Sequence, residues 1–109
     1  MTVRTDDFAI NVTGGLSWAR IAVTGELDLS VSSQLERALE REREARRSVI
    51  LDMARVTFMD STGLTLVLRA MKDAQANGWR FAIAAPLSKP VELVARVAGV
   101  LPMLPLVEE

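Results

Sequence analysis

The sequence predicts an α/β domain with a mixed, mostly parallel sheet, and three observations lead to this fold class. Short apolar runs with the length of strands occur at residues 8–12, 16–23, 48–59, 80–85 and 103–107. Apolar residues at helical spacing occupy the segments between the later runs, so helices should alternate with strands. Only the turn sequence Thr13-Gly14-Gly15 joins the first two runs, which predicts an N-terminal antiparallel hairpin.

The periodicity of the apolar residues defines the first strand and the first helix. Phe8, Ile10 and Val12 alternate with smaller or polar residues, as in a strand with one buried face. Residues 24–28 then interrupt the pattern of the second strand. From residue 30 onward the spacing becomes helical, and the residues expected on the buried face of this helix are Val31, Leu35, Ala38 and Leu39.

Serines and charges predict the start and the exposed side of this first helix. Ser30 can cap its first turn, and Ser33 with Glu36 offers a capping box as an alternative. Acidic and basic residues alternate over the rest of the helix, so this side, which includes Glu42, should face solvent. Opposite charges three or four residues apart, such as Glu42 and Arg46, should attract each other.

The second half of the chain continues the alternation of strands and helices. Residues 48–53 form a dense apolar run that is typical of a buried parallel strand, and residues 56–59 extend it. A helix should follow, because apolar residues recur at helical spacing. Its buried face is expected to hold Leu64, Val67, Leu68 and Met71.

The last elements are bounded by residues that favour helix ends and edge strands. Asn77-Gly78 is a helix stop, and a strand follows it. Ser88 and Pro90 favour the start of the last helix, and Gly99 favours its end. Pro105 confines the final strand to an edge or an end of the sheet.

Composition restricts the functions open to this chain. With 109 residues, 50% of them hydrophobic and 25% charged, it should fold as one domain. It contains no cysteine and no histidine, which excludes a disulfide scaffold, a thiolate zinc site and a Ser-His-Asp triad. We therefore expect no enzymatic activity, no metal and no cofactor.

Charge and hydropathy argue against two classes of partner. The chain has 13 basic and 14 acidic side chains and a net charge of −1, without the basic surplus of nucleic-acid-binding domains. No apolar run reaches the ~20 residues that a membrane helix needs. The polar N-terminus does not resemble a secretory signal, so the expected location is the cytoplasm.

The segment with most information about function is Asp60-Ser61-Thr62-Gly63, which follows a buried strand and opens a helix. It should lie at the carboxyl edge of the sheet, where ligands of open α/β domains usually bind. In one interpretation, Asp60 or Ser61 caps the helix and has no other role. In the other, Ser61 accepts a phosphoryl group, whose charge of ~−1.5 to −2 the helix N-terminus would stabilise.

Catalytic interpretations of this segment fail on the residues present. An aspartic protease requires an unbroken Asp-Thr-Gly or Asp-Ser-Gly triplet in two copies, and here Thr62 interrupts a single one. The phosphate-binding loop of nucleoside triphosphatases is absent. Nothing in the sequence brings together two of the three candidate carboxylates, Asp28, Asp52 and Asp60. Asp52 lies inside a strand, where a partly buried structural role is expected.

Two separated motifs resemble the STAS domain family, in particular the anti-sigma factor antagonists of bacteria. The first motif is Val23-Thr24-Gly25-Glu26-Leu27-Asp28. The second combines the strand at residues 49–53 with Phe58-Met59-Asp60-Ser61-Thr62-Gly63-Leu64. The resemblance covers nearly the whole chain and implies a single STAS domain over residues 1–109, with a mixed sheet and right-handed βα units.

The resemblance also implies partner switching controlled by phosphorylation. The unphosphorylated protein would bind an anti-sigma factor, a serine kinase of the histidine-kinase-like ATPase class, and so free a sigma factor. Phosphorylation of Ser61 would end this complex, and a serine phosphatase would restore it. Asp28 corresponds to a partner-facing aspartate of the family, and Asp60, Thr62 and Gly63 should line the same surface. Thr62 is a second, less favoured phosphoryl acceptor.

The resemblance leaves one alternative and one departure. The alternative is a STAS scaffold subunit of a signalling assembly or transporter that has no phosphorylation switch. The departure is that relatives commonly continue into a C-terminal helix, which is expected to be short or absent here. Met103, Leu104 and Leu106 would then be exposed and would favour a homodimer.

Overall fold

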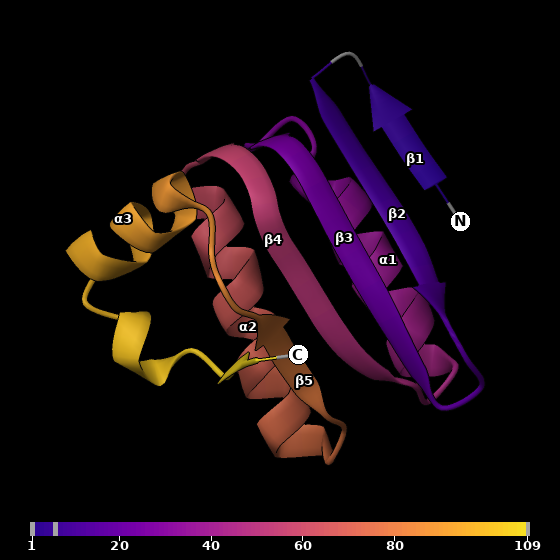
Figure 1. The fold of residues 1–109 in the computed structure, drawn as a ribbon. Helices are drawn as coiled ribbons and strands as arrows, with labels where there is room; N and C mark the ends of the chain where they lie inside the picture. Colours follow the sequence, from indigo (N-terminus) through magenta and orange to yellow (C-terminus); the bar gives the residue numbers. More distant parts are fainter. Residues whose placement is uncertain (1, 6, 109) are drawn as a thin grey trace.

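The computed structural model describes residues 2–5 and 7–108, with the elements shown in Figure 1. The strands are β1 (Thr2–Thr5), β2 (Phe8–Gly14), β3 (Trp18–Leu27), β4 (Ser48–Met59), β5 (Phe81–Ala84) and β6 (Leu106–Val107). The helices are α1 (Ser32–Glu44), α2 (Ser61–Asn77), α3 (Lys89–Val97) and a short 3-10 helix, η1 (Leu101–Met103). The predicted alternation of strands and helices is confirmed, and β1 is an additional strand.

The strands of the described residues form one sheet in chain order, from β1 to β6. The pairs β1–β2 and β2–β3 are antiparallel and the remaining pairs are parallel, which confirms the predicted mixed sheet with an N-terminal hairpin. The sequence analysis missed β1 because its side chains show little apolar alternation. Pairing with β2 holds it in place, and the Thr2 hydroxyl donates to Asn11 Oδ1 at 3.0 Å.

β3 continues through the residues where the sequence pattern predicted a break, and it ends at Leu27. Its parallel pairing with β4 changes register between Ala22 and Thr24, and again between Gly25 and Glu26. The Glu26 N–H donates to the carbonyl oxygen of Asp7 at 2.8 Å, which ties this part of β3 to the start of β2. The interrupted pattern therefore reflects local irregularities inside a long strand rather than its end.

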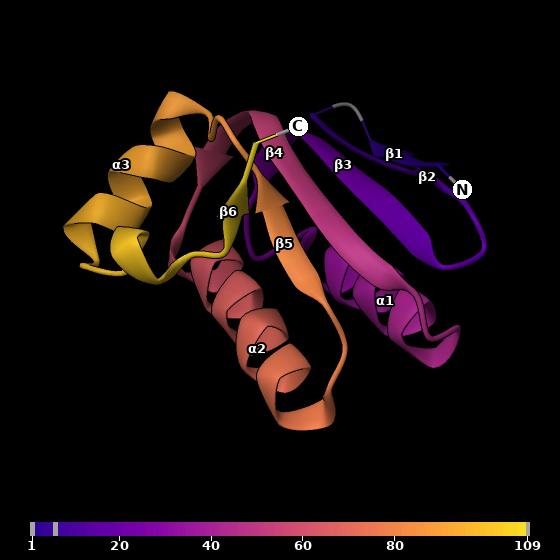
Figure 2. The ribbon, with the colours of Figure 1, turned by 60° about the horizontal axis from the view of Figure 1, so that its bottom comes forward.

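Two helices cover one face of the sheet. Figure 2 shows α1 and α2 lying along the same face, with α3 near β6. All four residues predicted for the buried face of α1 are buried, and so are three of the four predicted for α2, while Leu68 is half-buried. The described residues contain no helix that is both long and apolar enough to cross a membrane.

Glu42 departs from the predicted pattern of α1. Expected to face solvent, it is only 4% exposed. Its carboxylate accepts a hydrogen bond from Arg47 Nη1 at 2.8 Å, and the Arg47 N–H donates to the Glu42 carbonyl oxygen at 3.0 Å. The predicted exposure of Glu42 and its predicted pairing with Arg46 are wrong. The turn that ends α1 brings Arg47, not Arg46, over the carboxylate.

The C-terminal part confirms the predicted start of the last helix and the predicted edge position of the last strand. It corrects the predicted exposure of Leu104. The Ser88 hydroxyl accepts from the Val91 N–H at 3.4 Å and caps α3, as predicted. β6 is the edge strand next to β5, which is consistent with the restriction imposed by Pro105. Met103 and Leu106 are exposed as expected, whereas Leu104 is buried, because the turn at η1 directs it into the core.

Candidate functional site

The two loops that carry the predicted site residues leave neighbouring parallel strands at the same level. Leu27, the last residue of β3, stands opposite Met59, the last residue of β4. Asp28 directly follows Leu27, and Asp60 directly follows Met59. Because parallel strands end at the same edge of a sheet, both aspartates lie at its carboxyl edge, where α1 and α2 begin.

Asp60 is the N-cap of α2. Its backbone is extended, with φ −99° and ψ −175°, and its Oδ1 accepts a hydrogen bond from the Gly63 N–H at 3.1 Å. An N-cap side chain commonly accepts from the N–H three residues later, so this is a regular cap. Of the two caps that the sequence left open, the structure selects Asp60. This choice leaves the Ser61 hydroxyl available for other chemistry.

Ser61 is the first residue of α2 and is exposed. Among the described residues its hydroxyl has no hydrogen-bond partner. The first turn of a helix presents N–H groups without intrahelical acceptors, and Asp60 occupies only the one from Gly63. A phosphoryl group on Ser61 would therefore lie beside N–H donors and the positive end of the helix dipole.

Gly63 has a packing role that the sequence analysis did not anticipate. It is buried, and a Cβ at this position would lie 2.8 Å from Met59 Cγ and 3.0 Å from the Leu27 carbonyl oxygen. The absence of a side chain lets the first turn of α2 pack against the ends of β3 and β4. Gly63 therefore lies beneath the surface that Ser61 and Thr62 line, and its expected part in partner binding stays a prediction.

Asp28 organises the turn between β3 and α1. Its Oδ1 accepts hydrogen bonds from the Ser30 N–H at 2.9 Å and from the Ser30 hydroxyl at 2.6 Å. Its carbonyl oxygen accepts from the Ser32 N–H at 3.0 Å. Ser30 therefore serves this turn and does not cap α1, whose N-cap is Val31 without a side-chain hydrogen bond. Neither of the two caps predicted for this helix forms.

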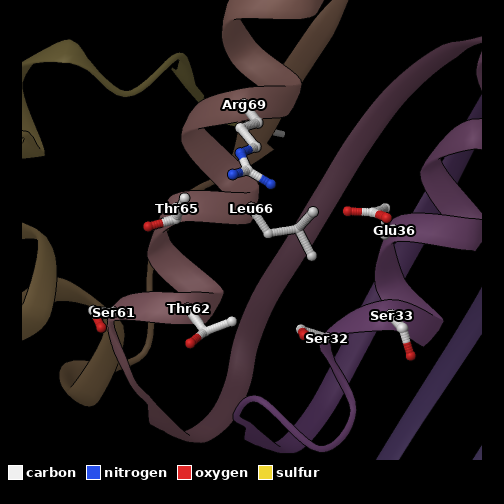
Figure 3. Close-up of a pocket in the computed structure, with 8 residues that line it drawn as sticks. All are labelled: Ser32, Ser33, Glu36, Ser61, Thr62, Thr65, Leu66 and Arg69. Carbon is white, nitrogen blue, oxygen red and sulfur yellow. The ribbon is translucent and has the colours of Figure 1, made fainter.

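A polar groove runs between the first turns of α1 and α2 (Figure 3). Its volume is about 340 Å³. Five hydroxyl side chains line it together with a carboxylate, a guanidinium and one apolar residue: Ser32, Ser33, Ser61, Thr62, Thr65, Glu36, Arg69 and Leu66. Figure 3 shows Glu36 on the α1 side and Arg69 on the α2 side. Neither side chain forms an ion pair within the part of the chain that the structure describes.

The sequence analysis missed Thr65 and Arg69 as members of this surface. The signal was present, because Ser61, Thr65 and Arg69 are spaced four residues apart and lie along one side of a helix. Ser32 could not have been found in this way. It reaches the groove only because β3 and β4 are parallel neighbours, which places the first turn of α1 beside that of α2.

The candidate carboxylates act separately. Asp28 forms its turn and Asp60 caps α2, while Asp52 pairs with Arg20 at 2.8 Å on β3 and β4. Burial alone would raise the pKa of Asp52. Hydrogen bonds from the Ala54 N–H and from Arg20, together with the positive charge of Arg20, outweigh burial and hold this pKa below its usual 3.8. The structural role expected of Asp52 is confirmed.

The described residues hold no group of three or more histidine, cysteine, aspartate or glutamate side chains suited to a metal ion. The Ser61 hydroxyl also lacks a hydrogen-bonded base among these residues. The arrangement is an exposed serine at a helix N-terminus, flanked by two loops that each begin with an aspartate. It defines a small α/β domain with a polar carboxyl edge.

Comparison with known families identifies the class more closely. The family model described as STAS domain matches residues 8–109, so the chain belongs to the STAS domain family. This match confirms the family expected from the two sequence motifs. It also begins at the first residue of β2 and extends through all three helices.

Several solved structures share the fold. The anti-sigma factor antagonist SpoIIAA in its unphosphorylated form is 24% identical, with a TM-score of 0.73 over 92% of this chain and 87% of that chain. The Bacillus protein SpoIIAA in its phosphorylated form is also 24% identical, with a TM-score of 0.70 over 92% and 90%. An anti-sigma factor antagonist from Mycobacterium paratuberculosis is 19% identical, with a TM-score of 0.79 over 94% and 87%.

Proposed function

We propose that this protein is an anti-sigma factor antagonist whose binding is controlled by phosphorylation of Ser61. One observation carries the proposal: Asp60 caps α2, so the exposed Ser61 hydroxyl can be modified without loss of the cap. Membership of the STAS family supports the proposal. So does the likeness in fold to antagonists known in unphosphorylated and phosphorylated forms.

The proposed docking surface is the carboxyl edge formed by Asp28, Asp60, Ser61 and Thr62. Its partner is an anti-sigma factor that is also a serine kinase of the histidine-kinase-like ATPase class, and binding frees a sigma factor in the cytoplasm. A serine phosphatase restores the unmodified state. Gly63 contributes by letting α2 pack closely, which positions the two residues before it.

Release follows from local electrostatics rather than unfolding. A phosphoryl group would add a charge of ~−1.5 to −2 at the first residue of α2. The helix N-terminus stabilises this charge, so α2 should remain folded. The surface seen by the partner changes, because a bulky, negatively charged group now stands directly after Asp60. An interface matched to the neutral hydroxyl loses charge complementarity and shape at the same place.

The proposed role of Ser61 is to be modified by another enzyme, not to act as a nucleophile. A serine nucleophile needs an adjacent base, and the chain has no histidine. Arg69 lines the same groove but cannot accept a proton at neutral pH. Binding is therefore the activity that the residues at this edge support.

Three purified variants test the proposal: Ser61→Ala, Ser61→Asp and, as a control, Ser17→Asp in the β2–β3 hairpin. Ser17 is an exposed serine at the opposite end of the sheet, so the control adds the same charge away from the docking edge. Each protein serves as bait in the native cytoplasm, and the affinity of the recovered kinase is then measured with purified components.

We expect Ser61→Ala and Ser17→Asp to bind the kinase like the wild type. Ser61→Asp should bind at least ~10-fold more weakly, equivalent to about 1.4 kcal/mol. Equal affinities for Ser61→Ala and Ser61→Asp would contradict the switch. Recovery of the same proteins by all baits, with no serine kinase among them, would instead favour the scaffold function.

A further inference from the structure

We propose a second binding site, at the end of the sheet opposite Ser61, for a small compound that carries several phosphate charges. The site is a pocket of about 600 Å³ where α1 and α2 end and where β4 and β5 begin. Its volume lies in the range of small-molecule sites, ~300–1,000 Å³. Four arginines line it without any carboxylate: Arg43, Arg46, Arg47 and Arg80. This proposal does not depend on the function proposed for Ser61.

Carboxylates beside the pocket hold two of these arginines in place. Asp73 Oδ2 accepts from Arg43 Nε at 3.2 Å and from Trp79 Nε1 at 2.8 Å. The buried Glu42 carboxylate accepts from Arg47 Nη1 at 2.8 Å. Both carboxylates thus form hydrogen bonds to these side chains, and neither carboxylate lines the pocket. They orient the two guanidinium groups, which keep further N–H donors for a ligand.

The other two arginines have no paired carboxylate within the described residues. Arg46 and Arg80 are exposed, and neither forms an ion pair within the described residues. Glu40 and Glu44 line a neighbouring hollow that also includes Arg43 and Arg46, but they form no part of this pocket. The pocket therefore combines two arginines that carboxylates orient, Arg43 and Arg47, with two that form no ion pair within the described residues, Arg46 and Arg80.

The backbone of Arg46 supports a role beyond stability. Its φ is 59°, and the Arg46 N–H donates to the Arg43 carbonyl oxygen at 3.0 Å in the turn that ends α1. Glycine is favoured at this position after a helix, because other residues pay a steric penalty there. α2 ends in the same pocket with Gly78, whose φ is 73°. An arginine at this position, where its backbone conformation costs free energy, indicates that the Arg46 guanidinium has a role in binding.

The guanidinium donors and the helix ends at this pocket together indicate the class of ligand. Guanidinium groups bind phosphate oxygens with two parallel hydrogen bonds and so select phosphate over spherical anions. The C-terminal ends of α1 and α2 both face the pocket, and their negative dipole ends oppose any anion, so binding needs contacts with several guanidinium groups at once. A compound with several linked phosphates can contact the oriented and the free arginines at once. We therefore expect tripolyphosphate to bind more tightly than pyrophosphate, and pyrophosphate more tightly than orthophosphate.

The test uses the full chain and amide nuclear magnetic resonance at ~150 mM salt, where exposed charges are screened beyond ~8 Å. Tripolyphosphate should shift the amides of Arg46, Ser48 and Gly78 and leave that of Ser61 unchanged. The double variant Arg46→Gly, Arg80→Gln should bind at least tenfold more weakly. Arg37→Gln, which removes an exposed arginine of α1 outside the pocket, should bind like the wild type.

Three results would overturn the proposal. Equal weakening by Arg37→Gln and by the double variant would show nonspecific attraction to positive charge. Sulfate that binds as tightly as tripolyphosphate would show an anion site without selectivity for linked phosphates. Tripolyphosphate that shifts none of the three pocket amides in the wild-type protein, shown to be folded by its amide spectrum, would show that the pocket does not bind such compounds.

Discussion

The Glu42 carboxylate and the Arg47 guanidinium form an ion pair of 2.8 Å in which only 5% of the Glu42 side chain is exposed. The pair joins the last turn of α1 to the segment that leads into β4. Glu42 and Arg47 also line a hollow with Val12 and Trp18, so the pair lies beside the β2–β3 hairpin. A charge at this depth is tolerated because its partner remains hydrogen-bonded to it.

We expect Glu42→Gln to lower the free energy of unfolding by about 1–3 kcal/mol, because the buried hydrogen bond from Arg47 loses the negative charge of its acceptor. Arg47 is 32% exposed and can be rehydrated in part, so the larger costs of fully buried pairs do not apply. Urea denaturation measures the change. Glu40→Gln, on the exposed side of the same helix, is the control and should stay within about 0.5 kcal/mol of the wild type. Equal effects of the two variants would contradict the burial of the pair.

Gly63→Ala should destabilise the protein by about 1–3 kcal/mol, the usual cost of overpacking. The added Cβ meets the Leu27 backbone, which cannot move without disturbing the end of β3. Gly15→Ala is a matched control, since a Cβ there would meet only the flexible Trp18 side chain at 3.4 Å. Thermal unfolding of both variants distinguishes a steric cost at Gly63 from the general effect of replacing glycine. A stable Gly63→Ala protein would mean that α2 does not pack this closely.

Asp60 variants separate capping from partner recognition. Asp60→Ala should cost about 1 kcal/mol of stability, because the Gly63 N–H loses its acceptor. Asp60→Ser restores a capping oxygen without charge, so it should retain most of the stability. If the charge of Asp60 contributes to docking, Asp60→Ser should still weaken binding of the anti-sigma factor. Chemical denaturation and titration calorimetry measure the two effects, and stability equal for Ala and Ser would contradict the capping role.

Periodicity predicted most of the fold because the buried faces of α1, α2 and β2 repeat at the spacing of their elements. Leu35 and Leu39 on α1 are buried, as the helical pattern requires. Glu42 could not be predicted in the same way, since its burial depends on a turn that brings Arg47 back over the helix. β1 and the irregular part of β3 depend on pairing with other strands, which local patterns do not encode.

The candidate site was predicted to a similar extent. The motif placed Asp60 and Ser61 at a helix start, and the structure confirms this. The roles of Asp28 and Gly63 depend on contacts with Ser30 and with Leu27. The groove with Arg69 forms only when two helices start side by side. The contact of Gly63 with Leu27 and the groove both require the parallel pairing of β3 and β4, whereas the hydrogen bonds of Asp28 with Ser30 form within one turn.

Arg46→Gly should raise the free energy of unfolding by about 0.5–1 kcal/mol, since glycine adopts a positive φ without the steric penalty of a side chain. Arg46→Ala keeps a Cβ in the same conformation and should bring no comparable gain. Urea denaturation of the pair isolates the backbone contribution, because both variants lack the guanidinium. A gain of equal size in both variants would instead point to relief of charge repulsion among the arginines.

Asp52 should make stability sensitive to acid. Its folded-state pKa lies below the unfolded value of 3.8, so the ionised carboxylate stabilises the fold. This contribution is present above pH 3.8 and is lost as the pH falls through the lower folded-state pKa. Unfolding measured between about pH 6 and pH 2 should therefore show a steeper loss for the wild type than for Asp52→Asn. Asp7→Asn, an exposed aspartate, is the control and should follow the wild type. Identical acid profiles for Asp52→Asn and the wild type would show that the pair with Arg20 does not stabilise the sheet.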